Sequence, residues 1–310
     1  MVDCRKLISH RVRGFGQYEN CRTALRRACR SAVPILEVDT RVAADGRIFV
    51  YHNPRGRYHL SERPDFSRMD GAALRRVRYP SGETLLELDE CLRIFAARHD
   101  PAQRLCIDMK DVGFERQHLE LAQRHGVAEQ LSWMSWVPHS LRQLRQLGAP
   151  GPLILAHCNL ARFGTPGRWL EAAMARRTVR IARLVLRGID AEHRPSAALH
   201  HGFQHGMLCT QLRPDLEALL RQSGGGVCVY RGLFSNGVAA SCRSAGLALW
   251  VFRVRTAGGF RRLARHPGIS AVFCDDAPGV LRMRSAPDAL ATTPPTPRPR
   301  FEQEGQPLLA

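Results

Sequence analysis

Polar and charged side chains stand at or near the ends of several short apolar runs in this sequence. In chain order these residues are His10, Arg11, Glu37, Asp39, His52, Asp108 and Lys110. Such groups are costly to bury unless they pair with one another or bind a ligand. Each residue alone has an ordinary structural explanation, but their joint placement predicts a single site assembled from several strands.

Carboxylates dominate the candidate site. Glu37 and Asp39 are two residues apart, so on a strand their side chains point the same way, and Asp108 and Lys110 repeat this spacing. Three carboxylates that meet would repel one another strongly unless a cation joined them. Oxygen ligands favour Mg²⁺ or Ca²⁺ over zinc. We therefore predict one divalent cation beside Glu37, Asp39 and Asp108.

A cation together with Lys110 offers what cleavage of a phosphodiester requires, because both offset the negative charge of the transition state. His10 and His52 could divide the proton transfers, one accepting from the nucleophile and one donating to the leaving alcohol. The planar guanidinium of Arg11 is suited to a non-bridging phosphate oxygen. Lys110 is one of only two lysines in the chain, the other being Lys6.

The elements that must position these residues are short β-like runs separated by helical patterns. Helices are expected at 22–30, with Asn20 as its cap, and at 85–99. The candidate strands are 6–9, 33–39, 47–52, 105–109, 130–135, 152–156, 247–252 and 270–274. This alternation predicts an α/β fold, a (β/α)₈ TIM-like barrel whose strand ends converge on one mouth. The sixth strand has three candidates, at 181–186, 207–212 and 227–230.

Composition limits the other possibilities. The chain has 310 residues and a formal charge of +18, but its arginines are spread along the whole length and only 7% of residues are aromatic, so we expect no nucleic-acid partner. The charge favours anionic ligands and permits peripheral contact with an anionic membrane. The ten cysteines lack zinc-site spacing and are expected to be reduced, mostly buried thiols.

Targeting and domain boundaries are also expected from the sequence. The start lacks a secretory apolar core and no run reaches about 18 apolar residues, so a cytoplasmic location is expected. The barrel should occupy residues 1–284. The Pro-rich stretch 285–310 is typical of a disordered tail.

Read in order, these motifs resemble the glycerophosphodiester phosphodiesterase family. Its pattern runs His-Arg-Gly, Pro-Glu-Asn, Glu-x-Asp-Val, Asp-Gly, His-Asp and Glu-x-Lys, followed late in the chain by Trp-Thr-Val and Thr-Asp-x-Pro. The matching segments here are 9–11, 18–20, 36–39, 45–46, 50–52, 107–110, 250–251 and 276–278. The resemblance is close over residues 5–110 and looser over 245–281.

The resemblance implies a TIM barrel that hydrolyses glycerophosphodiesters, or lysophospholipids in some members, to an alcohol and a phosphomonoester. It implies a metal held by Glu37, Asp39 and Asp108, with His10 and His52 as the acid–base pair. Arg11 and Lys110 would hold phosphate. Glu19 would support the metal site, and Asn20 would cap a helix.

The sequence departs from the family pattern at three places, and substrate preference is the property that we expect these departures to affect most. The His-Arg-Gly turn becomes His10-Arg11-Val12-Arg13-Gly14, which reshapes the first loop. Asn53 replaces the aspartate after the second histidine. Asp108 replaces a glutamate and is shorter by one methylene.

Other reactions and roles remain open at this point. A phospholipase D-like lyase on the same barrel would use the same metal and histidines but form a cyclic phosphate. A non-catalytic barrel could bind phosphate or headgroups without turnover, although it would not need a paired acid and base. The oligomeric state, the leaving alcohol and the choice of Mg²⁺ or Ca²⁺ do not follow from the sequence.

Overall fold

A computed structural model describes residues 3–52, 60–98, 100–156, 212 and 214–285 of the chain. Its eight parallel strands form a closed barrel, in which β1 pairs with both β10 and β2. They are β1 Leu7–Ser9, β2 Ile35–Val42, β5 Arg104–Met109, β6 Leu131–Ser135, β7 Leu153–Leu155, β8 Gly226–Tyr230, β9 Ala248–Val254 and β10 Ala271–Cys274. The predicted (β/α)₈ barrel is therefore confirmed.

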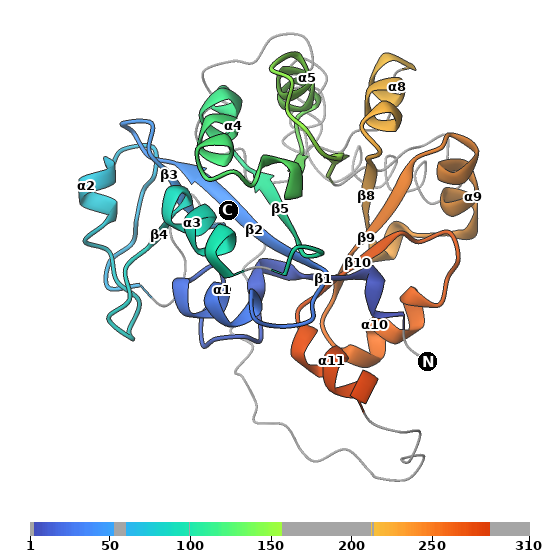
Figure 1. Ribbon diagram of the computed structural model, residues 1–310, viewed down its shortest axis with the longest axis horizontal. Helices are drawn as coiled ribbons and strands as arrows, with labels where there is room; N and C mark the ends of the chain where they lie inside the picture. The colour runs from blue at the N-terminus through green and yellow to red at the C-terminus, as the bar shows by residue number, and fades with distance from the viewer. Residues whose placement is uncertain (1–2, 53–59, 99, 157–211, 213, 286–310) are drawn as a thin grey trace, which may run out of the picture.

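Helices surround this barrel (Figure 1). Within the described residues these helices are α1 Arg22–Ala28, α3 Leu88–Arg98, α4 Glu115–Arg124, α5 Pro138–Gln146, α8 Pro214–Gln222, α9 Asn236–Ser244, α10 Ala257–Ala264 and α11 Ala277–Ser285. A short helix, α2 Gly71–Leu74, lies to one side of the barrel (Figure 1). Parallel neighbouring strands need such crossover connections. Each strand begins at the end of the barrel opposite to the one where the previous strand finished, and a short turn cannot span that distance. The first and last strands lie side by side, so residues near the two ends of the barrel sequence meet at its mouth.

A small antiparallel extension leaves the barrel after its second strand. Beyond Thr40, β2 pairs with β3 Ile48–Val50, which in turn pairs with β4 Leu86–Glu87. The run predicted at 47–52 is therefore a strand, but it lies outside the barrel. The hairpin also explains why β2 continues to Val42, three residues beyond the predicted end.

Two apolar cores follow from the alternation of side chains along the strands. One fills the barrel and includes Ile8, Cys106, Met134, Trp250 and Phe273. The other lies between the strands and the helices. A residue two positions after an inner-core residue on the same strand therefore also points toward the barrel axis. Most of the candidate site residues are directed into the barrel in this way.

The structure bears on the predictions for the sixth strand, the first helix, the cysteines and membrane-spanning helices. The sixth barrel strand is β8, which contains the candidate run 227–230, whereas 181–186 and 207–211 lie outside the described residues. The predicted helix after Asn20 is α1, but its N-cap is Cys21, whose sulfur accepts a hydrogen bond from the Ala24 N–H. All eight described cysteines are buried thiols, as expected. Within the described residues, no helix is long and apolar enough to span a membrane.

Candidate active site

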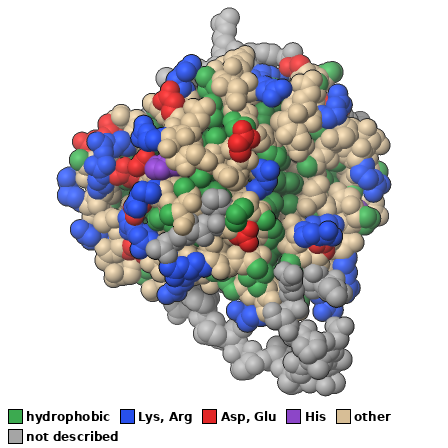
Figure 2. Space-filling model, in the orientation of Figure 1, with side chains coloured by type: hydrophobic (Ala, Val, Ile, Leu, Met, Phe, Trp, Pro, Cys, Tyr) green, Lys and Arg blue, Asp and Glu red, His purple; other side chains and the backbone are tan. Residues whose placement is uncertain are grey.

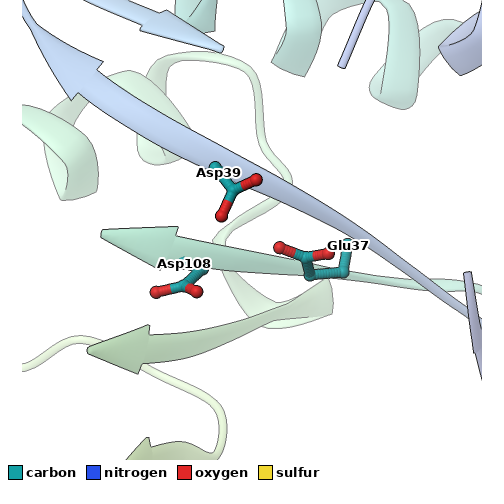
Figure 3. A group of neighbouring side chains, drawn as sticks. All are labelled: Glu37, Asp39 and Asp108. Carbon is teal, nitrogen blue, oxygen red and sulfur yellow. The ribbon is translucent and has the colours of Figure 1, made fainter. Parts of the chain in front are cut away.

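Three carboxylates from two neighbouring strands converge inside the barrel mouth. Glu37 and Asp39 lie on β2, and Asp108 lies on β5 directly opposite Asp39 in the parallel register. Figure 3 shows the three side chains directed into the same space. One oxygen from each lies within 4.8 Å of the others, and all three residues are buried. The structure thus brings together the acidic residues that the sequence selected.

Cationic side chains contact the same acids. Lys110 Nζ lies 2.9 Å from Asp39 Oδ1 and also contacts Asp108. Arg11 Nε lies 3.0 Å from Asp39 Oδ2. Lys110 additionally lies 5.4 Å from the centroid of the Trp136 ring, within cation–π range. Both predicted phosphate-holding residues therefore stand at the acidic cluster.

The charges of the cluster are unequally compensated. Burial, together with the nearby carboxylates of Asp39 and Asp108, raises the pKa of Glu37 well above its usual range. Burial also acts to raise the pKa of Asp39, but the charges of Lys110 and Arg11 outweigh it and hold that pKa well below the usual range. Glu37 is the member of the cluster that most lacks positive charge.

The residues present fit a hard divalent cation. Asp108 Oδ1 is buried and has no hydrogen-bond partner among the described residues. Buried carboxylate oxygens without partners are costly, and all three potential ligands are oxygen donors of the kind that Mg²⁺ and Ca²⁺ prefer. A cation among Glu37, Asp39 and Asp108 would satisfy this oxygen and supply the charge that Glu37 lacks.

The turn after β1 delivers backbone and side chain to the cluster. Arg11 has a φ of 56° and Val12 a φ of 48°, in the left-handed region that non-glycine residues rarely adopt. In this conformation the Arg11 N–H donates to Glu37 Oε2 at 2.7 Å. Gly14, with φ 81°, packs so closely on Pro278 that an added Cβ would lie 2.9 Å from its Cδ.

His10 is fixed by a carboxylate from the other end of the barrel sequence. Its Nδ1 lies 2.6 Å from Asp275 Oδ1, just after β10. Arg13 and Arg253 also contact Asp275, and with His10 they lower its pKa against the effect of burial. Burial and the charge of Arg11 lower the pKa of His10 to about 4. A neutral imidazole that donates from Nδ1 to Asp275 leaves Nε2 able to accept a proton.

His52 follows β3 and is partly buried. Burial and the charges of Arg11, Lys110 and Arg41 lower its pKa well below the usual range, although Asp39 acts in the opposite direction. The electrostatic influence of both cationic residues and Asp39 on His52 indicates that it belongs to the same charged neighbourhood as the acidic cluster.

A buried ion pair supports His52 from the strand that carries the acids. Arg41 is the next residue after Asp39 on the same face of β2, and Arg41 Nη1 lies 3.1 Å from Asp111 Oδ1. Arg41 Nε donates to the carbonyl of His52 at 2.9 Å. The other oxygen of Asp111 accepts from the Val42 N–H at 2.8 Å. Together these bonds connect β2, the end of β3 and the segment after β5.

Asn20 and Glu19 lie next to the acidic cluster. Asn20 was expected to cap a helix but caps none: with φ 53°, it donates from Nδ2 to Asp39 Oδ2 at 2.9 Å. Glu19 forms ion pairs with Arg11 and Arg13, and Arg11 in turn contacts Asp39, so Glu19 is linked to the acidic cluster through an arginine.

Three further residues escaped notice, namely Arg41, Asp111 and Asp275. A signal existed for Asp275, because Ala271 and Phe273 face the barrel interior and the same alternation continues to residue 275. Asp276, which the motif favoured, instead accepts a hydrogen bond from the Gly279 N–H at the start of α11.

Solved structures share this fold. A phosphodiesterase from Oleispira antarctica in complex with the product sn-glycerol-3-phosphate aligns with a TM-score of 0.64 at 16% identity, covering 91% of this chain and 97% of that one. A glycerophosphodiester phosphodiesterase from Parabacteroides distasonis gives 0.59 at 14% identity, covering 91% and 98%. One from Thermotoga maritima gives 0.55 at 16% identity, covering 90% and 98%.

No protein-family model matches the chain, and no curated protein sequence matches it. At the identities found among solved structures, similarity establishes the fold. The chain therefore has the barrel fold seen in solved glycerophosphodiester phosphodiesterases.

Proposed function

We propose that this protein is a metal-dependent glycerophosphodiester phosphodiesterase that releases an alcohol and glycerol 3-phosphate. The observation that carries the proposal is the buried cluster of Glu37, Asp39 and Asp108, whose oxygens lie within 4.8 Å of one another. His10 and its partner Asp275 stand at the same barrel mouth. The resemblance of the spaced motifs and the similarity of the fold to phosphodiesterase structures support the same reaction.

The cation would be held by Glu37, Asp39 and Asp108, and when bound it supplies positive charge to the phosphoryl oxygens. Lys110 and Arg11 contact Asp39 in the metal-free site. A cation would neutralise part of the Asp39 charge in their place, so both side chains could also bind the non-bridging oxygens of the phosphate. A phosphodiester carries one negative charge, so this cationic surface binds and orients it before reaction.

The two histidines would move the protons. His10 accepts a proton at Nε2 from the water that attacks phosphorus, and Asp275 stabilises the resulting imidazolium through Nδ1. His52 donates a proton to the leaving alcohol. Burial and the charges of Arg11 and Lys110 lower the pKa of His52 in the free site, and the negative charge of a bound phosphodiester acts to raise it.

An activity screen tests the proposal. Purified full-length protein is incubated with glycerophosphocholine, glycerophosphoethanolamine, glycerophosphoglycerol and lysophosphatidylcholine in Mg²⁺, Ca²⁺ or EDTA. We expect metal-dependent release of glycerol 3-phosphate from the three glycerophosphodiesters, or of lysophosphatidic acid from lysophosphatidylcholine, and EDTA should abolish it. Phosphorus NMR identifies the product, and a cyclic phosphate would assign the lyase reaction instead. Full activity in Glu37→Ala or His10→Ala would refute the assigned site.

Adjacent aspartates provide a matched pair of variants. Asp275→Asn should lower kcat by about 10²- to 10⁴-fold, because an amide no longer fixes the imidazole tautomer or stabilises the imidazolium. Asp276→Ala removes an acid at the next position, whose side-chain contacts among the described residues are with the Gly279 N–H at the start of α11 and with Arg282. It should leave kcat within about twofold while costing roughly 0.5–2 kcal/mol of stability. Equal effects of the two variants on kcat would contradict the role of Asp275.

A further inference from the structure

A β-bulge distorts β9 where it reaches the barrel mouth. Val251 pairs with Val272 of β10, but the next pair joins Val254 with Cys274, so two residues of β9 oppose the single residue Phe273. Val251 and Val254 both belong to the outer core. The two residues between them, Phe252 and Arg253, therefore depart from the regular alternation of side chains between the inner and outer faces of the barrel, as is usual at a β-bulge.

The bulge brings Arg253 to the residue that holds His10. Arg253 Nε donates to Asp275 Oδ2 at 2.8 Å, while the other oxygen of Asp275 bonds His10 Nδ1. The ring of the preceding Phe252 lies 6.2 Å from the His10 ring. Arg253 thus stands beside His10, one carboxylate away from it.

Only one part of the Arg253 guanidinium is used in this contact. Among the described residues, its bonds are confined to Nε, and its two terminal nitrogens have no partner. The side chain is 31% exposed, so part of it is accessible to solvent beside Asp275. Arg13, by contrast, contacts Glu19 and Asp275 through all three of its nitrogens.

The contacts of Arg253 also favour an anion. Asp275 is its only acidic partner among the described residues, and Arg253 shares that carboxylate with His10 and Arg13. A guanidinium held at Nε presents its terminal nitrogens as a fixed fork, which matches two oxygens of a carboxylate or a phosphate. Ordering costs little, because Asp275 already holds the side chain.

We propose that Arg253 forms an anion subsite beside the catalytic centre, and that the preferred substrates are phosphodiesters carrying a second anionic group, a carboxylate or a phosphomonoester. This inference rests on the proposed function for the identity of the substrate, but the subsite itself is a binding property of the barrel mouth.

Matched pairs of compounds test the subsite. Glycerophosphoserine differs from glycerophosphoethanolamine by one carboxylate. Glycerophosphoglycerol phosphate differs from glycerophosphoglycerol by one phosphomonoester, which can lie on either side of the diester. We expect kcat/KM to be about 10- to 100-fold higher for the more anionic member of at least one pair, as one charge-assisted bidentate contact provides. The pair that responds identifies carboxylate or phosphate as the anion.

Two variants locate the effect. Arg253→Gln keeps an N–H donor for Asp275 but lacks the terminal fork, so it should remove the preference. The preference is the ratio of kcat/KM within each pair, so a general loss of activity in this variant cancels. Arg255→Met removes the same charge from an exposed arginine two residues away and should keep the preference. A preference that survives Arg253→Gln, or that Arg255→Met removes equally, would overturn the subsite.

Calorimetry separates this inference from the proposed function. Binding of each pair is measured to the full-length His52→Gln protein in Ca²⁺, with and without Arg253→Gln. Tighter binding of the more anionic member that depends on Arg253 supports the subsite even if the wild-type protein hydrolyses none of the four compounds, a result that would refute only the proposed reaction. Equal binding within both pairs, or no binding, would overturn the subsite even if hydrolysis occurs.

Discussion

At the scale of single residues, His10 shows how burial and one carboxylate prepare an imidazole. Burial and Arg11 keep the ring neutral down to a pH of about 4, while Asp275 determines which nitrogen carries the hydrogen. A side chain that stays neutral in mild acid can accept a proton there, whereas an exposed histidine with its pKa near 6.5 would already be charged.

The lowered pKa of His10 predicts how stability depends on pH. Below about pH 6.5 the unfolded chain protonates this histidine, while the folded protein does so only near pH 4, so stability falls as pH falls through this window and changes no further below it. Between pH 7 and 5 the loss from His10 should be about 2 kcal/mol. Urea unfolding of wild type and His10→Gln at both pH values measures it. Equal pH dependence in the two proteins would contradict the prediction, since His52 and His118 contribute to both.

At the scale of elements, the hairpin that leaves the barrel after β2 has a role in the site. It brings His52 back to Arg41, whose guanidinium holds the His52 carbonyl and the carboxylate of Asp111. Both side chains of this ion pair are almost fully buried, at 1% and 2% exposure. Its main effect is to fix three segments relative to one another, because a buried pair adds little net stability over an apolar replacement.

Removal of only one partner of this ion pair should lower the stability of the fold strongly. Arg41→Met leaves the Asp111 charge buried and should cost about 3–5 kcal/mol of unfolding free energy, with a loss of kcat because the His52 backbone is released. Adding Asp111→Asn should recover part of the stability, since the amide oxygen still accepts from Val42. Arg75→Met, which breaks the more exposed pair with Glu87, should cost at most about 1 kcal/mol. Similar costs for Arg41 and Arg75 in chemical denaturation would refute this view.

Alternation of side chains made much of the element arrangement predictable. The barrel, most strand positions and the convergence of Glu37, Asp39 and Asp108 follow from short apolar runs that end in polar residues. Adjacent residues of similar type were harder to assign. Asn20 is a better capping type than Cys21, but its left-handed φ directs it to Asp39 instead. Asp276 fits the motif better than Asp275, but Asp275 continues the inward face of β10.

The contacts of Arg41 and the bulge at Arg253 depend on pairings between distant segments. No local pattern encodes them: the first joins β2 to residues after β3 and β5, and the second arises from the register between β9 and β10. Such features become visible only once the barrel has closed.

At the scale of the whole molecule, the chain carries a formal net charge of +18. Lysine and arginine side chains are scattered over the face shown in Figure 2, with acidic side chains among them. The densest arrangement of charge that the described residues offer lies instead inside the barrel mouth, where Arg11 and Lys110 contact the acidic cluster. A focused internal field suits a small anionic substrate better than an extended polyanion.

Metal binding should therefore stabilise the whole fold. At a free cation concentration 100 times the Kd, the unfolding free energy should rise by about 2.7 kcal/mol, and EDTA should reverse the change. Glu37→Gln should abolish this increase without destabilising the metal-free protein, because it removes a charge that lacks compensation and still accepts from the Arg11 N–H. Glu90→Gln, in an ion pair with Arg22 outside the site, is the control and should retain the increase. Thermal unfolding with Mg²⁺, Ca²⁺ and EDTA measures each effect; an unchanged response in Glu37→Gln would exclude the cluster as the metal site.

The bond between His10 and Asp275 joins residues 265 positions apart. During synthesis the three carboxylates leave the ribosome well before Asp275 does, by roughly ten seconds or more at ordinary elongation rates. A nascent or truncated chain can thus carry the proposed metal ligands, but the bond from His10 to Asp275 cannot form until the last strand closes against the first. Full activity is therefore a property of the finished chain, and a fragment ending before β10 should act as a poor hydrolase even if it captures metal.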